Sequence, residues 1–355
     1  MFKYGFIRIF YGIIRDNFSL GDSLMKKYVT LVPESSHHIY KIGLGTYDIL
    51  KSGLSDEKLR ELLTDFLDMG GNVIDTSISE LGLRRDEVEE SQKFIGRWIS
   101  SCNRRESIYL ISKSSFLLSN NTFDSLLNDL NISLKNLNTD YLDLFLIDGD
   151  DEKTDVSLIL GYLEDIKKDG KILNYGCSNW KPYRIRQAME YAKKHNIGGF
   201  VVNQMLWNAG VFGMDESKIE DKYVKMDSEM MDIHNEFNIL AMPYSALANG
   251  FFAKLYLNEM EPQTVDMEEL KLTSPYYTEK NLDLYEELKI IGEKYIASPS
   301  WAALGYLFNQ NIETCSIISV NNLNQLKEAF EAVDIKYTFE DFKSIDMFNI
   351  DEILV

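Results

Sequence analysis

The sequence predicts an α/β protein, a (β/α)8 TIM barrel with an N-terminal hairpin and long loops over the mouth. Three observations lead to this prediction. The chain has 355 residues, enough for one large barrel or two smaller domains. Eight short apolar runs alternate with longer helical patterns, and no Pro/Gly-rich linker interrupts them. The alternative, a doubly wound open sheet, would need a G-x-G-x-x-G turn, but Tyr47-Asp48 follow Gly43-x-Gly45.

The predicted strands share a nearly continuous apolar composition, which is typical of parallel strands that are buried on both faces. They are Tyr40–Gly45, Asn72–Asp75, Ile108–Lys113, Leu142–Asp148, Leu173–Ser178, Gly199–Gln204, Ile239–Tyr244 and Ser316–Val320. A polar segment that begins at Met25 precedes the first of them and predicts the hairpin.

Helical patterns fill the intervals between these strands. The first begins with Ser-Asp-Glu, a good helix start, and ends at Gly70-Gly71. Two longer inserts, Asn208–Lys225 and Leu255–Tyr277, are expected to be loops over the barrel mouth. The predicted helices are Ser55–Met69, Glu89–Ser101, Phe123–Leu137, Val156–Lys168, Pro182–His195, Asp227–Phe237, Leu282–Ile296 and Leu323–Val333.

The first residues do not continue the β/α pattern. Residues 1–24 are predicted to be a leader, disordered or amphipathic, ahead of a single barrel domain over residues 25–355. The apolar stretch Phe2–Ile14 is interrupted by Arg8, and no small-residue cleavage site follows it. No apolar run approaches the roughly 20 residues of a spanning helix, so no membrane span is expected.

Charge and cysteine content restrict the partners further. The chain carries 37 basic and 56 acidic residues, a net charge of −19, which makes nucleic acid an improbable partner. The cysteines Cys102, Cys177 and Cys315 are odd in number and form no CxxC pair. Neither a disulfide framework nor a metal site is therefore expected, and the cytoplasm is the predicted location. The oligomeric state stays open.

Five segments next to the predicted strands resemble the aldo-keto reductase superfamily in their order and spacing. They are Gly70–Ser77 (GxNxxDTA in the family), Ser133–Leu144 (SLxxLxxDYxDL), Gly176–Asn179 (GxSN), Gln204–Asn208 (QxxYN) and Tyr244–Gly250 (YSPLxxG). The resemblance runs from about residue 40 to 345 and implies hydride transfer between a nicotinamide cofactor and a carbonyl.

The family's catalytic tetrad of Asp, Tyr, Lys and His is matched only in half. Asp75 and Lys113 match the Asp and the Lys, but Glu80 stands at the Tyr position and Asp148 at the His position. We therefore expect Asp75, Glu80, Lys113 and Asp148 to form the catalytic set. Carboxylates that crowd one lysine would hold it charged, and one carboxyl would have a raised pKa and serve as general acid or base.

The resemblance also implies a cofactor site at the strand ends. The nicotinamide amide, the nicotinamide ring, the pyrophosphate and the ribose would each have partners. These are Ser178, Asn179 and Gln204 for the amide, Tyr244 for the ring, backbone amides of Ser245 and Leu247 for the pyrophosphate, and Gly45 and Thr46 near the ribose.

The adenosine end departs from the family pattern. Ser319 and Gln325 replace the usual basic residues, whereas Glu328 is retained. A 2′-phosphate is best held by a bidentate Arg, so NAD is the expected cofactor, with NADP as the alternative if Lys327 or Lys254 compensates.

The expected function is that of an aldo-keto-reductase-like NAD(P)-dependent oxidoreductase. The substrate would be a small polar carbonyl or alcohol, such as a sugar or sugar derivative. Two alternatives stay open: a non-redox lyase or epimerase that uses the Glu80/Asp148 pair, and a catalytically inactive nucleotide-sensing barrel. Asp148-Gly149-Asp150-Asp151 is interpreted as a solvated acidic turn rather than a metal loop, because the ligand spacing of a calcium loop is absent.

Overall fold

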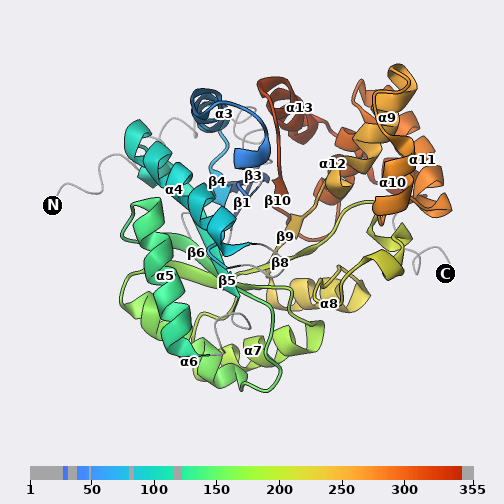
Figure 1. Cartoon of the computed structure of the whole chain (residues 1–355). Helices are drawn as coiled ribbons and strands as arrows, with labels where there is room; N and C mark the ends of the chain where they lie inside the picture. Colours follow the sequence, from blue (N-terminus) through green and yellow to red (C-terminus); the bar gives the residue numbers. More distant parts are fainter. Residues whose placement is uncertain (1–26, 31–37, 48, 80–83, 116–121, 346–355) are drawn as a thin grey trace, which may run out of the picture.

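A computed structural model describes residues 27–30, 38–47, 49–79, 84–115, 122–345. Eight parallel strands lie side by side in the order β10-β3-β4-β5-β6-β7-β8-β9, surrounded by helices (Figure 1). All eight predicted strands are present within a few residues of their expected bounds. They are β3 Ile42–Gly45, β4 Val73–Asp75, β5 Tyr109–Ser115, β6 Leu142–Asp148, β7 Ile172–Ser178, β8 Val202–Leu206, β9 Leu240–Tyr244 and β10 Ser316–Ile318.

The first and last strands of this order meet and close the barrel. Ala241 of β9 pairs in parallel with Thr314, just before β10. The backbone N–H of Ala241 donates to the carbonyl of Glu313 at 3.1 Å, and that of Cys315 donates to the carbonyl of Ala241 at 2.9 Å. The predicted (β/α)8 barrel is confirmed, and the open doubly wound sheet is excluded.

All eight predicted helices are also present, and most begin at a side-chain cap. Ser55, Thr122, Asp155, Asp227 and Asn322 each accept a backbone N–H in the first turn of the helix that follows. The bounds are α3 Asp56–Asp68, α4 Arg85–Cys102, α5 Phe123–Leu137, α6 Val156–Lys168, α7 Pro182–His195, α8 Ser228–Phe237, α11 Glu279–Tyr295 and α13 Leu323–Asp334.

The predicted hairpin closes one end of the barrel. Strands β1 (Tyr28–Thr30) and β2 (His38–Tyr40) pair antiparallel. Val29 and Ile39 are buried and belong to the same apolar cluster as the inward-facing residues of the barrel strands. The hairpin therefore fills the end of the barrel at which the strands begin. The leader, residues 1–24, lies outside the described residues.

The second long insert differs from the prediction. Asn208–Lys225 holds only the short turns η3 (Val211–Gly213) and η4 (Glu216–Lys218), as expected for a loop. Leu255–Tyr277, predicted as a loop, instead contains most of α9 (Phe251–Met260) and all of α10 (Met267–Thr273). The Asp266 side chain accepts the N–H of Glu269 and caps α10, and tertiary packing buries Phe251, Phe252 and Leu255 on one face of α9.

Helix α12 (Pro299–Phe308) was not predicted. Almost all of its residues are buried, so its sequence shows no polar face and no amphipathic period. Pro299 stands at its first position, where a missing N–H costs nothing. The short α14 (Phe339–Phe342) was missed as well. Among the described residues, no helix combines the length and apolar composition that crossing a bilayer requires.

The side chains inside the barrel form layers, because every second residue of each strand faces inward. Inward-facing Val73, Ile111, Leu146, Val202, Met242 and Ile317 form an apolar layer within one cluster. Because side chains alternate along a strand, the residue two positions further on faces inward as well, one layer nearer the mouth. Those positions are Asp75, Lys113, Asp148, Gln204, Tyr244 and Ser319, so six of the predicted site residues belong to the next layer of the same barrel.

Candidate active site

A buried polar triangle lies on the floor of the mouth, between β4, β5 and β8. The Lys113 ammonium Nζ lies 3.1 Å from Asp75 Oδ2 and 2.7 Å from Gln204 Oε1. Gln204 Nε2 donates to the same Asp75 Oδ2 at 3.2 Å. Lys113 and Asp75 are each 5% exposed, and Gln204 is fully buried. The Lys–Asp half of the predicted tetrad is therefore assembled as an ion pair, with an amide that contacts both partners.

Asp75 also organises the neighbouring strand end through its backbone. Its carbonyl accepts the backbone N–H of Thr46 at 3.1 Å and the Thr46 hydroxyl at 3.0 Å. Asp75 Oδ1 is buried and has no hydrogen-bond partner among the described residues. A buried carboxylate oxygen without a donor is costly, and such a group in a structure calls for an explanation such as a bound water or ligand.

Asp148 is the last residue of β6, the strand that lies next to β5. It is 1% exposed, and its Oδ1 accepts the Ser178 hydroxyl at 2.9 Å and Asn179 Nδ2 at 2.8 Å. The carboxylate is thus held by the two side chains that the sequence assigns to the nicotinamide amide. Glu80, the other predicted acid, lies outside the described residues.

Asn179 links Asp148 to two further strand ends. Its backbone has a φ of 57°, in the left-handed region that Asn tolerates. The Asn179 Oδ1 atom accepts the Tyr244 hydroxyl at 2.7 Å and the backbone N–H of Val224 at 3.2 Å. The end of β7, the end of β9 and the insert over residues 208–225 therefore meet at this one amide.

The segment after β9 has the backbone of an anion-binding turn. Ser245, Ala248, Asn249 and Gly250 all have positive φ, between 50° and 75°. Helix α9 begins directly after Gly250, and no side chain caps its first turn. Uncapped amides at a helix start, preceded by left-handed residues, form a concave array of N–H groups suited to phosphate. The predicted pyrophosphate segment, which includes Ser245 and Leu247, thus has a geometry that fits its predicted ligand.

A small cavity brings two further predicted cofactor residues together. It is lined by Gly45 and Ser319 along with Leu44, Ile49, Leu62, Leu63, Val320 and Asn321. A Cβ atom at Gly45 would lie 3.1 Å from Ile317 Cγ2 and 3.8 Å from the Ser319 hydroxyl, so a larger side chain would narrow this space.

The other two adenosine-end residues have partners within the protein. Gln325 Oε1 accepts the backbone N–H of Asn321 at 2.8 Å. Glu328 Oε2 accepts the Trp301 indole N–H at 2.8 Å. Glu328 is exposed, while Gln325 is half-buried.

The acidic turn after β6 was predicted to be solvated, and this is wrong. Asp150 is held by Arg184 in a two-pronged contact at 2.7 and 3.1 Å, with both side chains only 6% exposed. Arg184 also donates to the carbonyls of Asp151 and Thr154. The turn is buried because an arginine from α7, 34 residues further along the chain, neutralises it. Local sequence offers no signal for that pairing.

A second group near the mouth was also missed. The Tyr47 hydroxyl donates to Glu87 Oε2 at 3.0 Å and accepts from Lys51 Nζ at 2.9 Å. Tyr47 directly follows Thr46, the residue bound to Asp75. The four-residue spacing of Tyr47 and Lys51 is the signal that could have indicated their contact.

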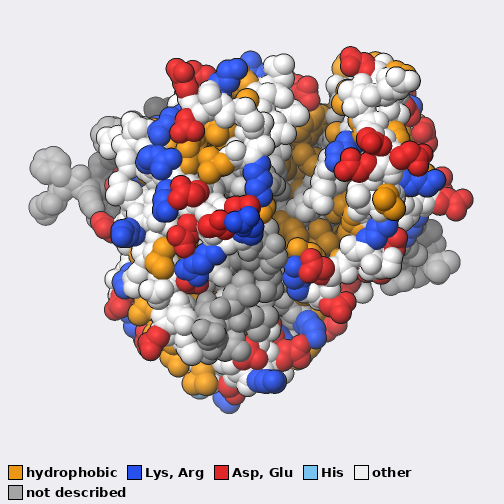
Figure 2. All heavy atoms as spheres, in the orientation of Figure 1, with side chains coloured by type: hydrophobic (Ala, Val, Ile, Leu, Met, Phe, Trp, Pro, Cys, Tyr) orange, Lys and Arg blue, Asp and Glu red, His pale blue; other side chains and the backbone are white. Residues whose placement is uncertain are grey.

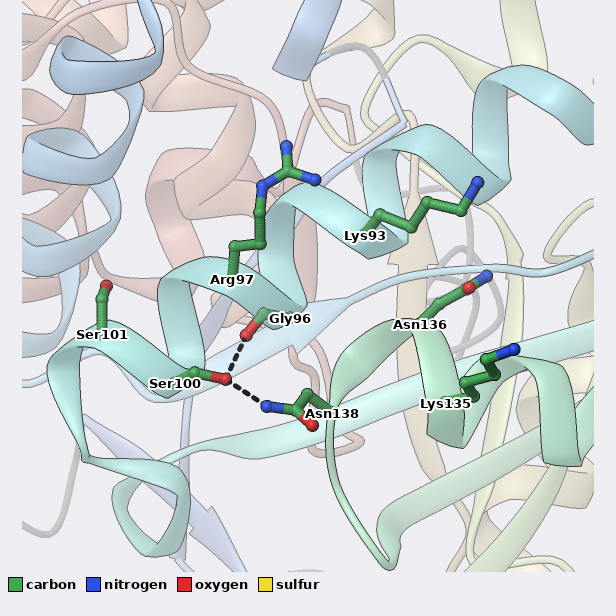
Figure 3. Close-up of a pocket in the computed structure, with 8 residues that line it drawn as sticks. All are labelled: Lys93, Gly96, Arg97, Ser100, Ser101, Lys135, Asn136 and Asn138. Carbon is green, nitrogen blue, oxygen red and sulfur yellow. Dashed lines mark hydrogen bonds between the residues drawn. The ribbon is translucent and has the colours of Figure 1, made fainter.

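The shape of the surface agrees with a site at the strand ends. Figure 2 shows a hollow between the lobe of α9, α10 and α11 and the rest of the molecule, with hydrophobic side chains along it. A different hollow lies on the outer wall, between α4 and α5 (Figure 3). Lys93, Arg97 and Lys135 line it, and Asn138 Nδ2 donates to the Ser100 hydroxyl at 2.5 Å. None of the predicted site residues borders this outer hollow. Among the described residues, no cluster of side chains is suited to hold a metal ion.

A (β/α)8 barrel with a polar layer at the carboxyl ends of its strands defines the class of barrel enzymes. Within that class the chain belongs to the aldo/keto reductase family, whose model matches residues 41–350. It is an oxidoreductase of a family that uses NAD(P) on small molecules.

Individual relatives are distant. The chain is 24% identical over 341 residues to "Aryl-alcohol dehydrogenase GME11368" of Pestalotiopsis microspora, covering 91% of this chain and 82% of the relative. It is 25% identical over 308 residues to "Aldo-keto reductase yakc [NADP(+)]" of Schizosaccharomyces pombe, covering 82% of each. Among solved structures, the thermostable aldo-keto reductase Tm1743, in complex with the inhibitor epalrestat, superimposes with a TM-score of 0.64 at 22% identity. That match covers 90% of this chain and 99% of the other.

Proposed function

We propose that this protein interconverts a small polar alcohol and the corresponding carbonyl with a nicotinamide dinucleotide, NAD in preference to NADP. The buried Lys113–Asp75 ion pair in the inward layer next to the mouth carries the proposal. It is the half of the family tetrad that this sequence retains. Gln204, which contacts both of its members, pairs in register with Ser178, a predicted nicotinamide partner.

The cofactor end of the site is supported by the uncapped start of α9 and the left-handed residues before it. A dinucleotide bound there would supply or accept a hydride. The backbone amides after Gly250 would hold its phosphates, and Gly45 leaves room beside Ser319. The preference for NAD rests on Ser319 and Gln325, which place no positive charge at the adenosine end.

Residues of the chain itself would then accept the proton that leaves the substrate hydroxyl. Lys113, held by Asp75, places a positive charge where an alkoxide develops, and this stabilises it. Glu80 would act as the base that takes the hydroxyl proton, and Asp148 would orient Ser178 and Asn179 toward the substrate side of the ring. An ionised carboxylate is a better base than acid, so alcohol oxidation is the favoured direction.

A polar substrate is supported by the polar inward layer. A sugar, polyol or sugar derivative would use it fully, because its hydroxyls can donate to carboxylates and serines. Aryl alcohols belong in the same test, because one relative is named for oxidising them.

The decisive experiment has two steps. The protein is first titrated with NADH and with NADPH, and binding is followed by the fluorescence of the reduced ring. It is then mixed with NAD or NADP and panels of sugars, polyols and aryl alcohols, while ring absorbance is recorded. Binding with turnover is expected. Binding without turnover on any panel would indicate a sensing barrel, and turnover of a sugar without change in the ring would indicate a lyase or epimerase.

A further inference from the structure

Gln204 makes contacts that an amide clamp for nicotinamide would not need. Its Oε1 accepts from the Lys113 ammonium at 2.7 Å, a shorter contact than the 3.1 Å ion pair between Lys113 and Asp75. Its Nε2 donates to Asp75 Oδ2 at 3.2 Å. One side-chain amide therefore contacts both members of the ion pair, and all three side chains are buried.

The chemistry of an amide explains why this position suits it. Burial disfavours a charged ammonium, and a second carboxylate beside Asp75 would add repulsion between like charges. A neutral amide supplies an acceptor to the ammonium and a donor to the carboxylate without changing the net charge. Because Gln204 and Lys113 come from β8 and β5, on different parts of the barrel wall, the amide also restricts where the long lysine side chain ends.

We propose that Gln204 is a positioning residue that holds the Lys113 ammonium at its place beside Asp75, in addition to any contact with the nicotinamide amide. This inference rests on the proposed function for its catalytic consequence, although the placement of Lys113 can be measured without it. Lysine positioning would then be shared between Asp75 and Gln204.

The test uses the cofactor-free protein, with ¹⁵N-labelled lysine. The Nζ signal of Lys113, assigned by its loss in Lys113→Arg, reports hydrogen exchange of the ammonium. In Gln204→Met, which removes both hydrogen bonds at similar size, exchange should be about tenfold faster or more, since a hydrogen bond to a charged group is lost. Gln204→Glu keeps an acceptor for Lys113 and should retain most of the protection. Ser178→Ala serves as the matched control, because Ser178 has no hydrogen bond to Lys113, and exchange should not change.

Kinetics supply the second measurement. Gln204→Met should lower kcat by about tenfold to a hundredfold, the effect of a misplaced catalytic group, and kcat should fall by a larger factor than the Kd for NADH rises. Ser178→Ala should show the reverse, a weaker Kd with a smaller effect on kcat.

Unchanged ammonium exchange in Gln204→Met would overturn the proposal, whatever the turnover. If Gln204→Met does not fold, Gln204→Glu takes its place in the comparison. Faster exchange of the Lys113 ammonium in Gln204→Glu than in Ser178→Ala would then overturn the proposal, because the acceptor that the Glu side chain retains would not protect the ammonium. An absence of turnover in the unmodified protein would refute the proposed function alone, because the exchange measurement needs no substrate.

Discussion

The Tyr244 hydroxyl donates to Asn179 Oδ1 at 2.7 Å, and this hydrogen bond joins the ends of β9 and β7, which lie on either side of β8. The backbone N–H of Val224 donates to the same oxygen, so the insert before α8 is attached as well. Asn179 Nδ2 in turn donates to Asp148. Three of the residues assigned to the nicotinamide, Tyr244, Asn179 and Ser178, are therefore linked to one another directly or through Asp148.

The first prediction tests this link. Tyr244→Phe keeps the aromatic ring but removes the donor to Asn179. Loss of one such hydrogen bond costs about 0.5–1.5 kcal/mol, so the Kd for NADH should rise about two- to tenfold. Fluorescence titration measures the change. Tyr183→Phe, on the exposed face of α7, is the control and should bind NADH normally. An unchanged Kd in Tyr244→Phe would show that the hydroxyl plays no part in ordering the site.

The second prediction concerns cofactor choice. Gln325→Arg introduces a charged partner for a 2′-phosphate near Ser319. A charged hydrogen bond contributes about 1.5–3 kcal/mol, so binding of NADP(H) relative to NAD(H) should improve by at least tenfold. Parallel titrations with both cofactors measure the ratio. Much tighter binding of NADP(H) than of NAD(H) by the unmodified protein would contradict the proposed preference.

The third prediction concerns the acid at the family's tyrosine position. Glu80→Gln preserves size and hydrogen bonding but removes the base, so turnover should fall about 10²–10⁴-fold, with little change in binding. Single-turnover kinetics on a substrate identified in the panels measures the effect. Normal turnover by this variant would make Glu80 a bystander.

The fourth prediction concerns acid stability. His234 is buried, and burial lowers its pKa from 6.5 to about 4, although its contact with the Ile239 carbonyl opposes the shift. The unfolded chain therefore binds a proton more readily than the folded one. Stability from this group is complete above about pH 6.5 and is lost as the pH falls toward 4, by about 3 kcal/mol in total.

Urea unfolding at pH 7 and at pH 4.5 measures this effect. In His234→Gln, the decrease in the free energy of unfolding between the two pH values should be smaller than in the unmodified protein. An equal decrease in both proteins would assign acid sensitivity to other groups.

The fifth prediction concerns the buried turn after β6. Burial raises the pKa of Asp150, and Arg184 opposes that rise. Arg184→Met would leave the carboxylate buried without its partner, a change that typically costs about 3–5 kcal/mol. Chemical unfolding should show this loss, and the double variant Arg184→Met with Asp150→Leu should recover much of it. If Arg184→Met and the unmodified protein are equally stable, Asp150 does not need Arg184 as a partner, and the interpretation of the turn as a buried ion pair is wrong.

The elements that could be predicted are those with local signals. The strands were recognisable because both of their faces are buried, and the capped helices because Ser55 or Asp227 precedes an amphipathic period. Helix α12 gave no such signal, since its residues are buried on all sides. Helices α9 and α10 were taken for loops because the burial that supports them depends on tertiary packing, although Asp266 provides α10 with a local cap.

The sequence by itself determined the barrel, its family and the positions in the layer at the mouth, because strand periodicity and chain order are local properties. Only the tertiary structure decided how those positions are connected. Lys113 meets Gln204 across 91 residues, and Asp150 meets Arg184 across 34. Such contacts depend on the closure and register of the sheet, which bring strands far apart in the chain to one mouth. Burial of a charge there requires a partner, and the fold selects which side chain can reach it.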